Sequence, residues 1–549
     1  MTDSGFDGVN LEQRQGLMQQ WPLTVNRIID HAARWHGNVE VVSRISNGGC
    51  ARSTYSEVKA RAERLSGALH DIGVRPGDCV ATLAWNNLRH LEAWYGIMGM
   101  GAVCHTLNPR LFADHLEYII NIAEDRVIIV EDCFLSILEN IQDKLKSVNN
   151  IIILSDDGIS NYPNLRNTIA YEDIINNTNS QITWGDFDEN IAAGLCFTSG
   201  TTGLPKGVLY SHRSNFLHAI MCMTPDVFGI SSSDVIMPIV PMFHANAWGL
   251  TFTAPAAGAK LVFPGSQLDG ASVYELLETE AVTFSAAVPT VWQSLLTFLR
   301  DTGSRLSTLQ RMVVGGAALP EHILRSYQDD FGIRVVQAWG MTEMSPVGTV
   351  STLTPGVEKL DKDQKYKYSL KQGRSPLCVD MEIFNDNNEP LPHDGNSMGY
   401  LKVRGPWVAN SYINSEDDIL DDNGYFNTGD VSTIDNYGFM HIVDRSKDII
   451  KSGGEWISSI EIENIIAGHP EVVLCAVVAK DDAKWGERPI LIIEAKDESS
   501  KNKDTFLSFL SDKVAKWWIP DEIIFVDKIP IGSTGKIDKK AIRNEFADR

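Results

Sequence analysis

Short apolar runs alternate with longer segments of helical periodicity along the first 340 residues of the chain. Segments 21–36 and 55–70 repeat apolar residues three or four positions apart, which predicts amphipathic helices. Apolar runs rich in β-branched residues predict strands at 78–85, 102–105, 127–130, 151–154, 235–240, 281–288, 311–316 and 334–339. Strands that alternate with helices need crossover connections, so the pattern predicts an α/β fold with largely parallel sheets.

The pattern changes in two later regions. Residues 156–190 are polar and are expected to form a surface excursion, whereas residues 379–442 are rich in strand and turn signals. Beyond 444–448, Ser458 and Glu461 have the spacing of a capping box, which predicts a helix to about residue 469. Strand patterns at 472–478, 490–494 and 523–526 and a helical pattern near 504–517 complete a small α/β unit. We therefore predict two domains, 1–444 and 445–549.

The composition of the chain excludes some classes of function. The 549 residues carry a formal charge of −23, which argues against non-specific nucleic-acid binding, since that requires a basic face. Eight cysteines lie far apart without a CxxC pair, which is typical of buried free thiols in a reducing compartment. The acidic N-terminus lacks an apolar run, and no stretch of 18 apolar residues occurs. We expect a cytoplasmic protein without a membrane span.

A loop rich in glycine and hydroxyl groups lies between two apolar flanks at 195–211, and the flanks are expected to pair as a hairpin. Such a loop can present several N–H groups to an anion, and a lysine adds a positive charge. Because Pro205 precedes Lys206 and Gly207 follows it, the loop is not a Walker A motif. The loop suits a polyphosphate, although a solvated hairpin turn remains the alternative. Its candidate ligand residues are Thr198, Ser199, Gly200, Thr201, Thr202, Gly203 and Lys206.

Several further candidates follow the predicted strands, where α/β sheets bind ligands. Trp339 and Gly340 offer a stacking surface for a base, and Glu343 is the type of oxygen ligand that Mg²⁺ prefers. The small residues Gly316, Ala317 and Ala318 would let a flat ring lie against the backbone, or would simply allow close packing.

Other candidates carry weaker local signals. His244 and Trp248 either line a pocket or belong to the core, and Asp430 suits either a ribose diol or an ordinary turn. The cationic segment 444–456 is either a ligand-binding cluster or a solvated linker. Lys536 lies on a loop near the C-terminus, which could be a solvated tail.

Together these motifs resemble those of the adenylate-forming superfamily, which contains acyl-CoA synthetases, adenylation domains of peptide synthetases and beetle luciferases. The strings T-S-G-T-T-G-L-P-K-G, W-G-M-T-E, T-G-D, D-R-S-K-D and G-K-I occur in family order, and the similarity extends from about residue 21 to 536. The resemblance implies a large N-terminal domain of mixed and parallel sheets with helices and a β-rich subdomain. It also implies a small, mobile C-terminal α/β domain that rotates about a hinge at Lys447.

The resemblance also implies a role for each candidate. Lys536, Thr342, Glu343 and His244 would be catalytic, with Lys536 as the adenylation lysine, and Thr198 and Glu343 would hold Mg²⁺. His244, Trp248 and Gly340 would contact the acid, with Trp248 as the gate of its pocket. ATP would contact the loop residues above and Gly316, Ala317, Ala318, Ala338, Trp339, Gly340, Met341, Asp430 and Arg445. CoA would contact Lys451, Ser452, Gly453, Gly454, Glu455 and Trp456.

The implied reaction is ATP-dependent formation of an acyl-CoA from a carboxylic acid through an acyl-adenylate. Segments 85–92, 105–112 and 210–214 resemble the medium- and long-chain fatty acyl-CoA synthetase branch. They also resemble its close relative, the 3-methylmercaptopropionate–CoA ligase of dimethylsulfoniopropionate breakdown. We expect 3-methylmercaptopropionate or a short to medium-chain fatty acid as substrate, with a long-chain synthetase or a carrier-loading adenylation enzyme as alternatives. A homodimer is also expected.

Overall fold

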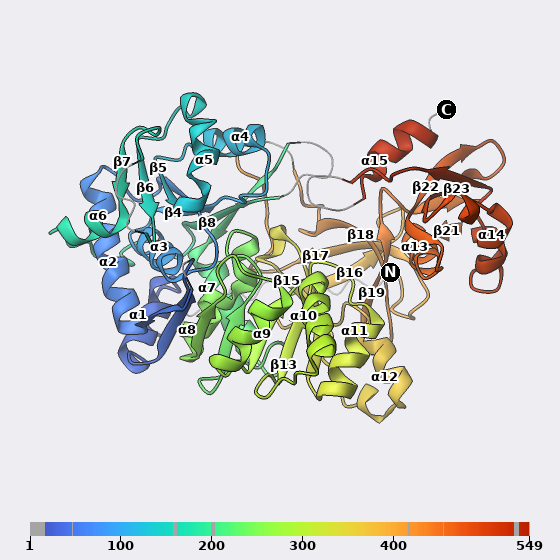
Figure 1. Cartoon of the computed structure of the whole chain (residues 1–549), viewed down its shortest axis with the longest axis horizontal. Coiled ribbons are helices and arrows are strands. Elements are labelled where there is room, and N and C mark those ends of the chain that lie inside the picture. The colour runs from blue at the N-terminus through green and yellow to red at the C-terminus, as the bar shows by residue number, and fades with distance from the viewer. Residues whose placement is uncertain are drawn as a thin grey trace, which may run out of the picture.

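A computed structural model describes residues 17–46, 48–157, 162–198, 204–415, 418–453, 455–531 and 537–547 (Figure 1). In this part of the chain the strands form four sheets, and helices pack on the two larger ones. The predicted α/β class, with a β-rich region and a further C-terminal α/β unit, is confirmed.

The first large sheet has seven strands in the order β7-β6-β5-β3-β4-β8-β9, parallel except for the β8–β9 pair. The antiparallel pairing of β8 with β9 confirms the predicted hairpin around the glycine-rich loop. The strands are β3 (Cys79–Leu83), β4 (Val103–Thr106), β5 (Val127–Glu131), β6 (Asn150–Leu154), β7 (Thr168–Ala170), β8 (Ala192–Phe197) and β9 (Gly207–Ser211).

The second large sheet has eight strands in the order β15-β14-β13-β12-β10-β11-β1-β2. It is parallel from β14 to β1, and antiparallel edge strands close both ends. The strands are β1 (Glu40–Arg44), β2 (Cys50–Thr54), β10 (Val235–Pro238), β11 (Lys260–Phe263), β12 (Phe284–Ala287), β13 (Arg311–Val314), β14 (Arg334–Gly340) and β15 (Val347–Val350).

Amphipathic helices bury their apolar faces on these sheets. Helix α2 begins with a full capping box, in which Thr54 and Glu57 bond each other's backbone N–H groups. The helices of this region are α1 (Asn26–Trp35), α2 (Tyr55–Asp71), α3 (Leu88–Gly99), α4 (Ala113–Ala123), α5 (Leu135–Glu139), α6 (Tyr171–Asn177), α7 (His212–Met223), α8 (Leu250–Ala257), α9 (Gly270–Thr279), α10 (Pro289–Thr302), α11 (Glu321–Arg325) and α12 (Lys362–Ser369).

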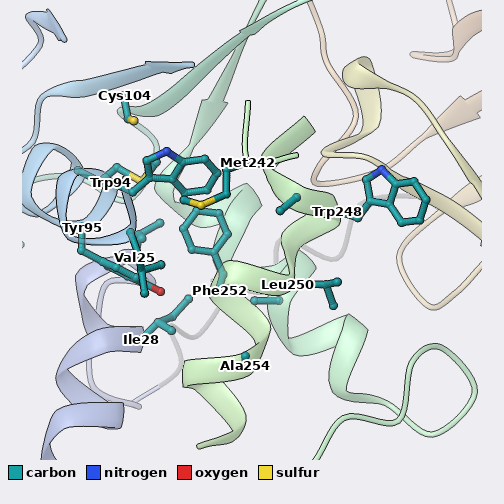
Figure 2. Packing of buried hydrophobic residues seen from close by; sticks show 14 of the residues in the cluster. Val25, Ile28, Trp94, Tyr95, Cys104, Met242, Trp248, Leu250, Phe252 and Ala254 are labelled. Atoms are coloured by element: carbon teal, nitrogen blue, oxygen red, sulfur yellow. The ribbon is translucent and has the colours of Figure 1, made fainter. Parts of the chain in front are cut away.

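The largest hydrophobic cluster joins both sheets through α1, α3 and α8. Figure 2 shows Trp94 of α3 packed against Met242 and Phe252, and the Trp94 and Phe252 ring centroids lie 5.6 Å apart. Because aromatic side chains of this size dominate core energetics, this packing fixes α8 and the turn that precedes it.

A four-stranded antiparallel sheet follows, with strands β16 (Asp380–Phe384), β17 (Gly399–Arg404), β18 (Phe426–Ile434) and β19 (Met440–Arg445). The last sheet contains β20 (Ile450–Ser452), β21 (Glu455–Ile457), β22 (Val472–Asp482), β23 (Gly486–Ala495) and β24 (Glu522–Val526). Helices α13 (Ser459–Ala467), α14 (Lys503–Ser511) and α15 (Lys539–Ile542) accompany it. The serine half of the predicted capping box is present, since Ser458 Oγ accepts a hydrogen bond from the Glu461 N–H at 3.1 Å.

Three expectations need correction. The polar segment 156–190 is not wholly irregular, because β7 and α6 lie within it and Tyr171 and Ile175 of α6 are buried. The first helix begins at Asn26 rather than at residue 21. All eight cysteines are free, but Cys133 and Cys378 are exposed rather than buried. Among the described residues, no helix has the length and apolar content needed to cross a bilayer.

Candidate active site

One narrow pocket, with a volume of about 50 Å³, gathers eight of the predicted site residues at the carboxyl ends of β10, β13 and β14. This is the edge of a parallel sheet at which α/β folds place their ligands. The predicted residues in its wall are His244, Trp248, Gly316, Ala338, Trp339, Gly340, Met341 and Thr342. Ala245, Pro346 and Val347 complete the lining. Ala317 and Ala318 follow Gly316 on the exposed surface and do not line the pocket.

The Trp339 side of the pocket continues into the four-stranded sheet. The Trp339 indole N–H donates to Asp430 Oδ2 at 3.2 Å, and Arg445 pairs with Asp430 Oδ1 at 3.0 Å. Asp430 and Arg445 face each other in the register of β18 and β19. Burial raises the pKa of Asp430, while Arg445 and the indole act in the opposite direction. Asp430, the candidate for a ribose diol, and Arg445, a predicted ATP contact, therefore lie directly beside Trp339, the predicted stacking residue for the base.

A second group of contacts joins the hairpin lysine to Glu343. The Lys206 Nζ lies 4.8 Å from the Tyr412 ring centroid, and the Tyr412 hydroxyl donates to Glu343 Oε1 at 2.8 Å. Burial, followed by the Glu343 carboxylate, raises the pKa of Tyr412, so the phenol stays protonated as a donor. Thr198 lies at the base of the loop, where its Oγ1 accepts from the Lys206 N–H at 3.3 Å.

Tyr412 and Tyr210 were missed as site residues. Tyr210 donates to the Thr342 carbonyl at 2.7 Å and thereby ties strand β9 to the segment after β14. Tyr412 lies 69 residues from Glu343 in a loop between β17 and β18. The local sequence around Tyr412 carries no motif, so a long-range contact of this kind had no sequence signal.

The segment between β10 and α8 has an unusual backbone. Ala245, Asn246, Ala247 and Trp248 have φ values of +43°, +58°, +50° and +54°, and Gly249 continues the left-handed run at +76°. A left-handed conformation costs about 1–2 kcal/mol for each L-residue that is not glycine. Surrounding contacts must therefore maintain the turn, and such strained segments concentrate at functional sites. We refer to residues 245–249 as the left-handed turn.

The left-handed turn is packed tightly on its neighbours. A Cβ atom at Gly249 would lie 2.6 Å from His218 Nδ1, and one at Gly315 would lie 2.8 Å from Cη2 of Trp248. His218 accepts a hydrogen bond at Nε2 from the N–H of Val347 at 3.2 Å. Burial lowers the pKa of His218 to about 3, so this ring is neutral at physiological pH.

The predicted CoA-binding residues lie away from the pocket. Those that the structure describes belong to strands β20 and β21 or adjoin them, and Lys451 and Trp456 contact Tyr400 of the four-stranded sheet. The Lys451 Nζ pairs with Asp386 at 2.9 Å and donates to the Tyr400 hydroxyl at 2.8 Å, and the Trp456 and Tyr400 rings lie 5.4 Å apart. None of Lys451, Ser452, Gly453, Glu455 and Trp456 lines the described pocket.

The predicted hinge region makes contacts to the C-terminal unit. Lys447 is exposed, and its neighbour Asp448 pairs with Arg543 at 2.6 Å. Asp444 Oδ2 accepts from the Ser459 N–H and hydroxyl at 2.6 and 2.7 Å. Ser199, Gly200, Thr201, Thr202, Gly203, Gly454 and Lys536 lie outside the described residues.

A larger cavity of about 470 Å³ lies at the carboxyl ends of β5, β6 and β11. Its wall carries Arg61, Arg89, Glu131, Asp156 and Glu172 but none of the predicted site residues. The chemistry predicted from the sequence therefore converges on the smaller pocket rather than on this larger cavity.

The fold and the pocket bring the residues predicted for a nucleotide and those predicted for a second substrate to one sheet edge. Residues 29–413 match the AMP-binding enzyme family and residues 461–536 match the AMP-binding enzyme C-terminal domain. The chain belongs to the AMP-binding enzyme family. The recognition made from the sequence motifs is thus confirmed.

Characterised relatives cover nearly the whole chain. The chain is 46% identical over 533 residues to the medium-chain-fatty-acid–CoA ligase of Ectopseudomonas oleovorans, covering 97% of this chain and 98% of the relative. It is 45% identical over 536 residues to the 3-methylmercaptopropionyl-CoA ligase of Ruegeria lacuscaerulensis, covering 97% and 99%. The crystal structure of the anthranilate CoA ligase AuaEII with anthranoyl-AMP has the same fold, with a TM-score of 0.80, 24% identity and coverage of 96% and 99%. These similarities confirm the predicted enzyme class, an AMP-forming acyl-CoA synthetase.

Proposed function

We propose that this enzyme activates a short or medium-length carboxylic acid with ATP and transfers the acyl group to CoA. The observation that carries the proposal is the shared pocket. His244 and Trp248 form the wall that we assign to the acid. Trp339, which is hydrogen-bonded to Asp430, forms the wall that we assign to the nucleotide. Gly340 lines the same pocket, and a Cβ atom there would lie 1.8 Å from the Pro346 carbonyl oxygen, so the close approach of the backbone requires glycine.

In the first half-reaction, an oxygen of the acid attacks the α-phosphorus of ATP. A carboxylate O–P bond forms as the bond to the β-phosphate breaks, and pyrophosphate leaves. Catalysis then depends on positioning and on donors that face the developing charge. We assign this charge stabilisation to Lys206, Thr342 and Lys536, and the placement of the carboxylate to His244. Loss of one preorganised donor typically costs about 2.7–4 kcal/mol of transition-state stabilisation.

The oxygen donors predicted for Mg²⁺ fit that ion chemically. Thr198 and Glu343 offer a hydroxyl and a carboxylate, and Mg²⁺ usually takes one or two protein oxygens and completes its shell with water and phosphate. The Tyr412 hydroxyl orients the Glu343 carboxylate through Oε1. When bound, the ion would neutralise charge on the phosphates of ATP.

In the second half-reaction, the CoA thiol loses its proton and attacks the acyl carbonyl, a C–S bond forms, the acyl C–O bond to the phosphate breaks and AMP leaves. We propose that the segment 445–549 moves as a unit about Lys447 and that the 451–456 hairpin then approaches the thiol. The contacts of Lys451 with Asp386 and Tyr400 would have to break in that movement. A short segment at the end of a structural element is typical of hinges.

The small size of the pocket supports a short acid. A volume of about 50 Å³ with the Trp248 ring in place leaves little room for an alkyl chain. We propose 3-methylmercaptopropionate or a short to medium-chain fatty acid, in line with the substrates in the names of the two relatives. A thioether acid is close in shape to an alkanoate, and one methylene contributes only about 1–3 kcal/mol of discrimination. A long-chain acid is the alternative, and it would require Trp248 to swing aside.

We further propose that the protein works in the cytoplasm as a homodimer. The eight free thiols support a reducing compartment. The dimer is expected from the family resemblance, and light scattering would test it.

The decisive experiment is a panel of kcat/KM values for propionate, 3-methylthiopropionate, butyrate, hexanoate, octanoate and palmitate, measured by AMP release with CoA. A maximum at or below octanoate supports the proposal, whereas a maximum at palmitate would establish the long-chain alternative. AMP release that requires a carrier protein instead of CoA would establish a carrier-loading enzyme.

A further inference from the structure

The left-handed turn forms the side of the pocket that we assign to the acid. His244 precedes it, and Ala245 and Trp248, which belong to it, line the pocket. Figure 2 shows Trp248 beside α8, which carries Leu250, Phe252 and Ala254 into the core. The orientation of the Trp248 ring therefore depends on a backbone that alanine and tryptophan adopt only under constraint.

The side-chain hydrogen bonds from the middle of the turn come from Asn246, because Ala245 and Ala247 carry only methyl groups. Asn246 is 1% exposed. Its Nδ2 donates to Asn215 Oδ1 at 3.3 Å, and its Oδ1 accepts a weak hydrogen bond from the Cys196 thiol at 3.8 Å. Asparagine also tolerates the left-handed region better than most residues.

These two contacts attach the turn to two separate elements. Asn215 belongs to α7, and Cys196 belongs to β8, two residues before Thr198. The Cys196 sulfur is itself held by Thr106 Oγ1 at 3.2 Å. A buried, charge-free set of hydrogen bonds of this kind fixes geometry well, since any displacement leaves a polar group unpartnered.

We propose that Asn246 is a positioning residue that sets the enzyme's selectivity for its acid. Asn246 does not line the pocket, so it acts through Trp248 and His244. By anchoring the turn to α7 and β8, it keeps the Trp248 ring against Gly315 and keeps the pocket narrow. The inference rests on the proposed acid site.

The test compares Asn246→Gly with Asn246→Ala. Glycine keeps the backbone freedom of the turn and removes only the anchor, whereas alanine also adds backbone strain. We expect kcat/KM for the preferred acid to fall about 10- to 100-fold in both variants, since misplacement by about 1 Å can cost 100-fold. The preference among propionate, octanoate and palmitate should shrink, and the KM for ATP should stay within about threefold. Asn215→Ala removes the anchor from the other side and should give a weaker effect in the same direction.

The matched control is Asn388→Ala, which places alanine at another left-handed position, with φ +62°, in the loop between β16 and β17. It should lower thermal stability without changing the acid profile. An unchanged acid profile in a folded Asn246→Gly enzyme would overturn the inference, as would a rise in the KM for ATP that equals the rise for the acid. If Asn246→Ala does not fold, the acid profiles of Asn246→Gly and Asn215→Ala test the proposal. A wild-type enzyme inactive on every acid would refute the proposed function instead.

Discussion

The indole N–H of Trp339 donates a hydrogen bond of 3.2 Å to the carboxylate of Asp430, although 91 residues separate them. Two residues that were predicted separately, one for the base and one for the ribose, therefore form a single hydrogen-bonded unit. Arg445 completes it from the neighbouring strand. Because Trp339 lines the pocket, we propose this unit as the place for the nucleoside.

Trp339→Phe tests this unit, because it keeps an aromatic face and removes the donor to Asp430. A lost hydrogen bond to a charged group costs about 1.5–3 kcal/mol, so the KM for ATP should rise roughly 10- to 100-fold. The KM for the acid should change little. Steady-state kinetics with each substrate varied in turn provide the measurement, and equal increases in both KM values would contradict the assignment.

Tyr412→Phe tests the link between Lys206 and Glu343. The ring that faces the Lys206 ammonium remains, while the hydroxyl that orients Glu343 is lost. The lost hydrogen bond should cost about 1.4 kcal/mol, so we expect pyrophosphate release to slow about tenfold. The Mg²⁺ concentration that gives the half-maximal rate should rise. A Mg²⁺ titration of the initial rate checks this. An unaltered Mg²⁺ dependence would show that Tyr412 has no role in Mg²⁺ binding.

Trp248→Ala should widen the acid pocket. The kcat/KM values for octanoate and palmitate should rise relative to propionate, while the KM for ATP stays nearly constant. The panel of acids described above provides the readout, with the thermal unfolding temperature as a control for folding. An acid profile identical to that of the unmodified enzyme would place the acid elsewhere.

Glu131 offers a test of stability in the larger cavity. Burial raises its pKa from 4.5 to about 7, against the hydrogen bonds from the Trp85 N–H and Asn87. As the pH rises, Glu131 loses its proton at a lower pH in the unfolded chain than in the folded protein. The protonated carboxyl therefore stabilises the folded state fully below pH 4.5, and this stabilisation is lost as the pH rises through 7. The slope is at most about 1.4 kcal/mol per pH unit.

Glu131→Gln removes that titration. The unfolding temperature of the unmodified protein should therefore fall relative to that of Glu131→Gln as the pH increases from 5 to 7.5, as measured by differential scanning calorimetry. A difference that is independent of pH would show that Glu131 is ionised throughout this range.

The strand ends that carry the site could be predicted from the sequence, because hydrophobic runs mark parallel strands and their carboxyl ends meet at one edge. The hydrophobic pattern predicted the strands next to Gly316, Trp339 and His244, the family resemblance assigned these residues to the site, and all three line the pocket. The motifs also identified the hairpin at 195–211, whose pairing depends on local turn chemistry.

Other features depend on contacts that no local pattern records. Tyr412 reaches Glu343 across 69 residues, and Lys451 reaches Asp386 across 65. The left-handed turn was unexpected, because its residues are ordinary helix or loop formers and tertiary contacts impose their conformation. The short helix α12 was missed because its sequence is almost wholly polar.

We propose that the enzyme joins its acid to AMP before CoA is involved and that Lys536 acts in that step alone. The most direct test is acid-dependent exchange of labelled pyrophosphate into ATP without CoA, compared between the unmodified enzyme and Lys536→Ala. We predict exchange in the unmodified enzyme, its loss by about 100-fold or more in the variant, and retention of thioester formation from supplied acyl-AMP. Absence of exchange with every acid, or equal loss of both half-reactions in the variant, would contradict the account.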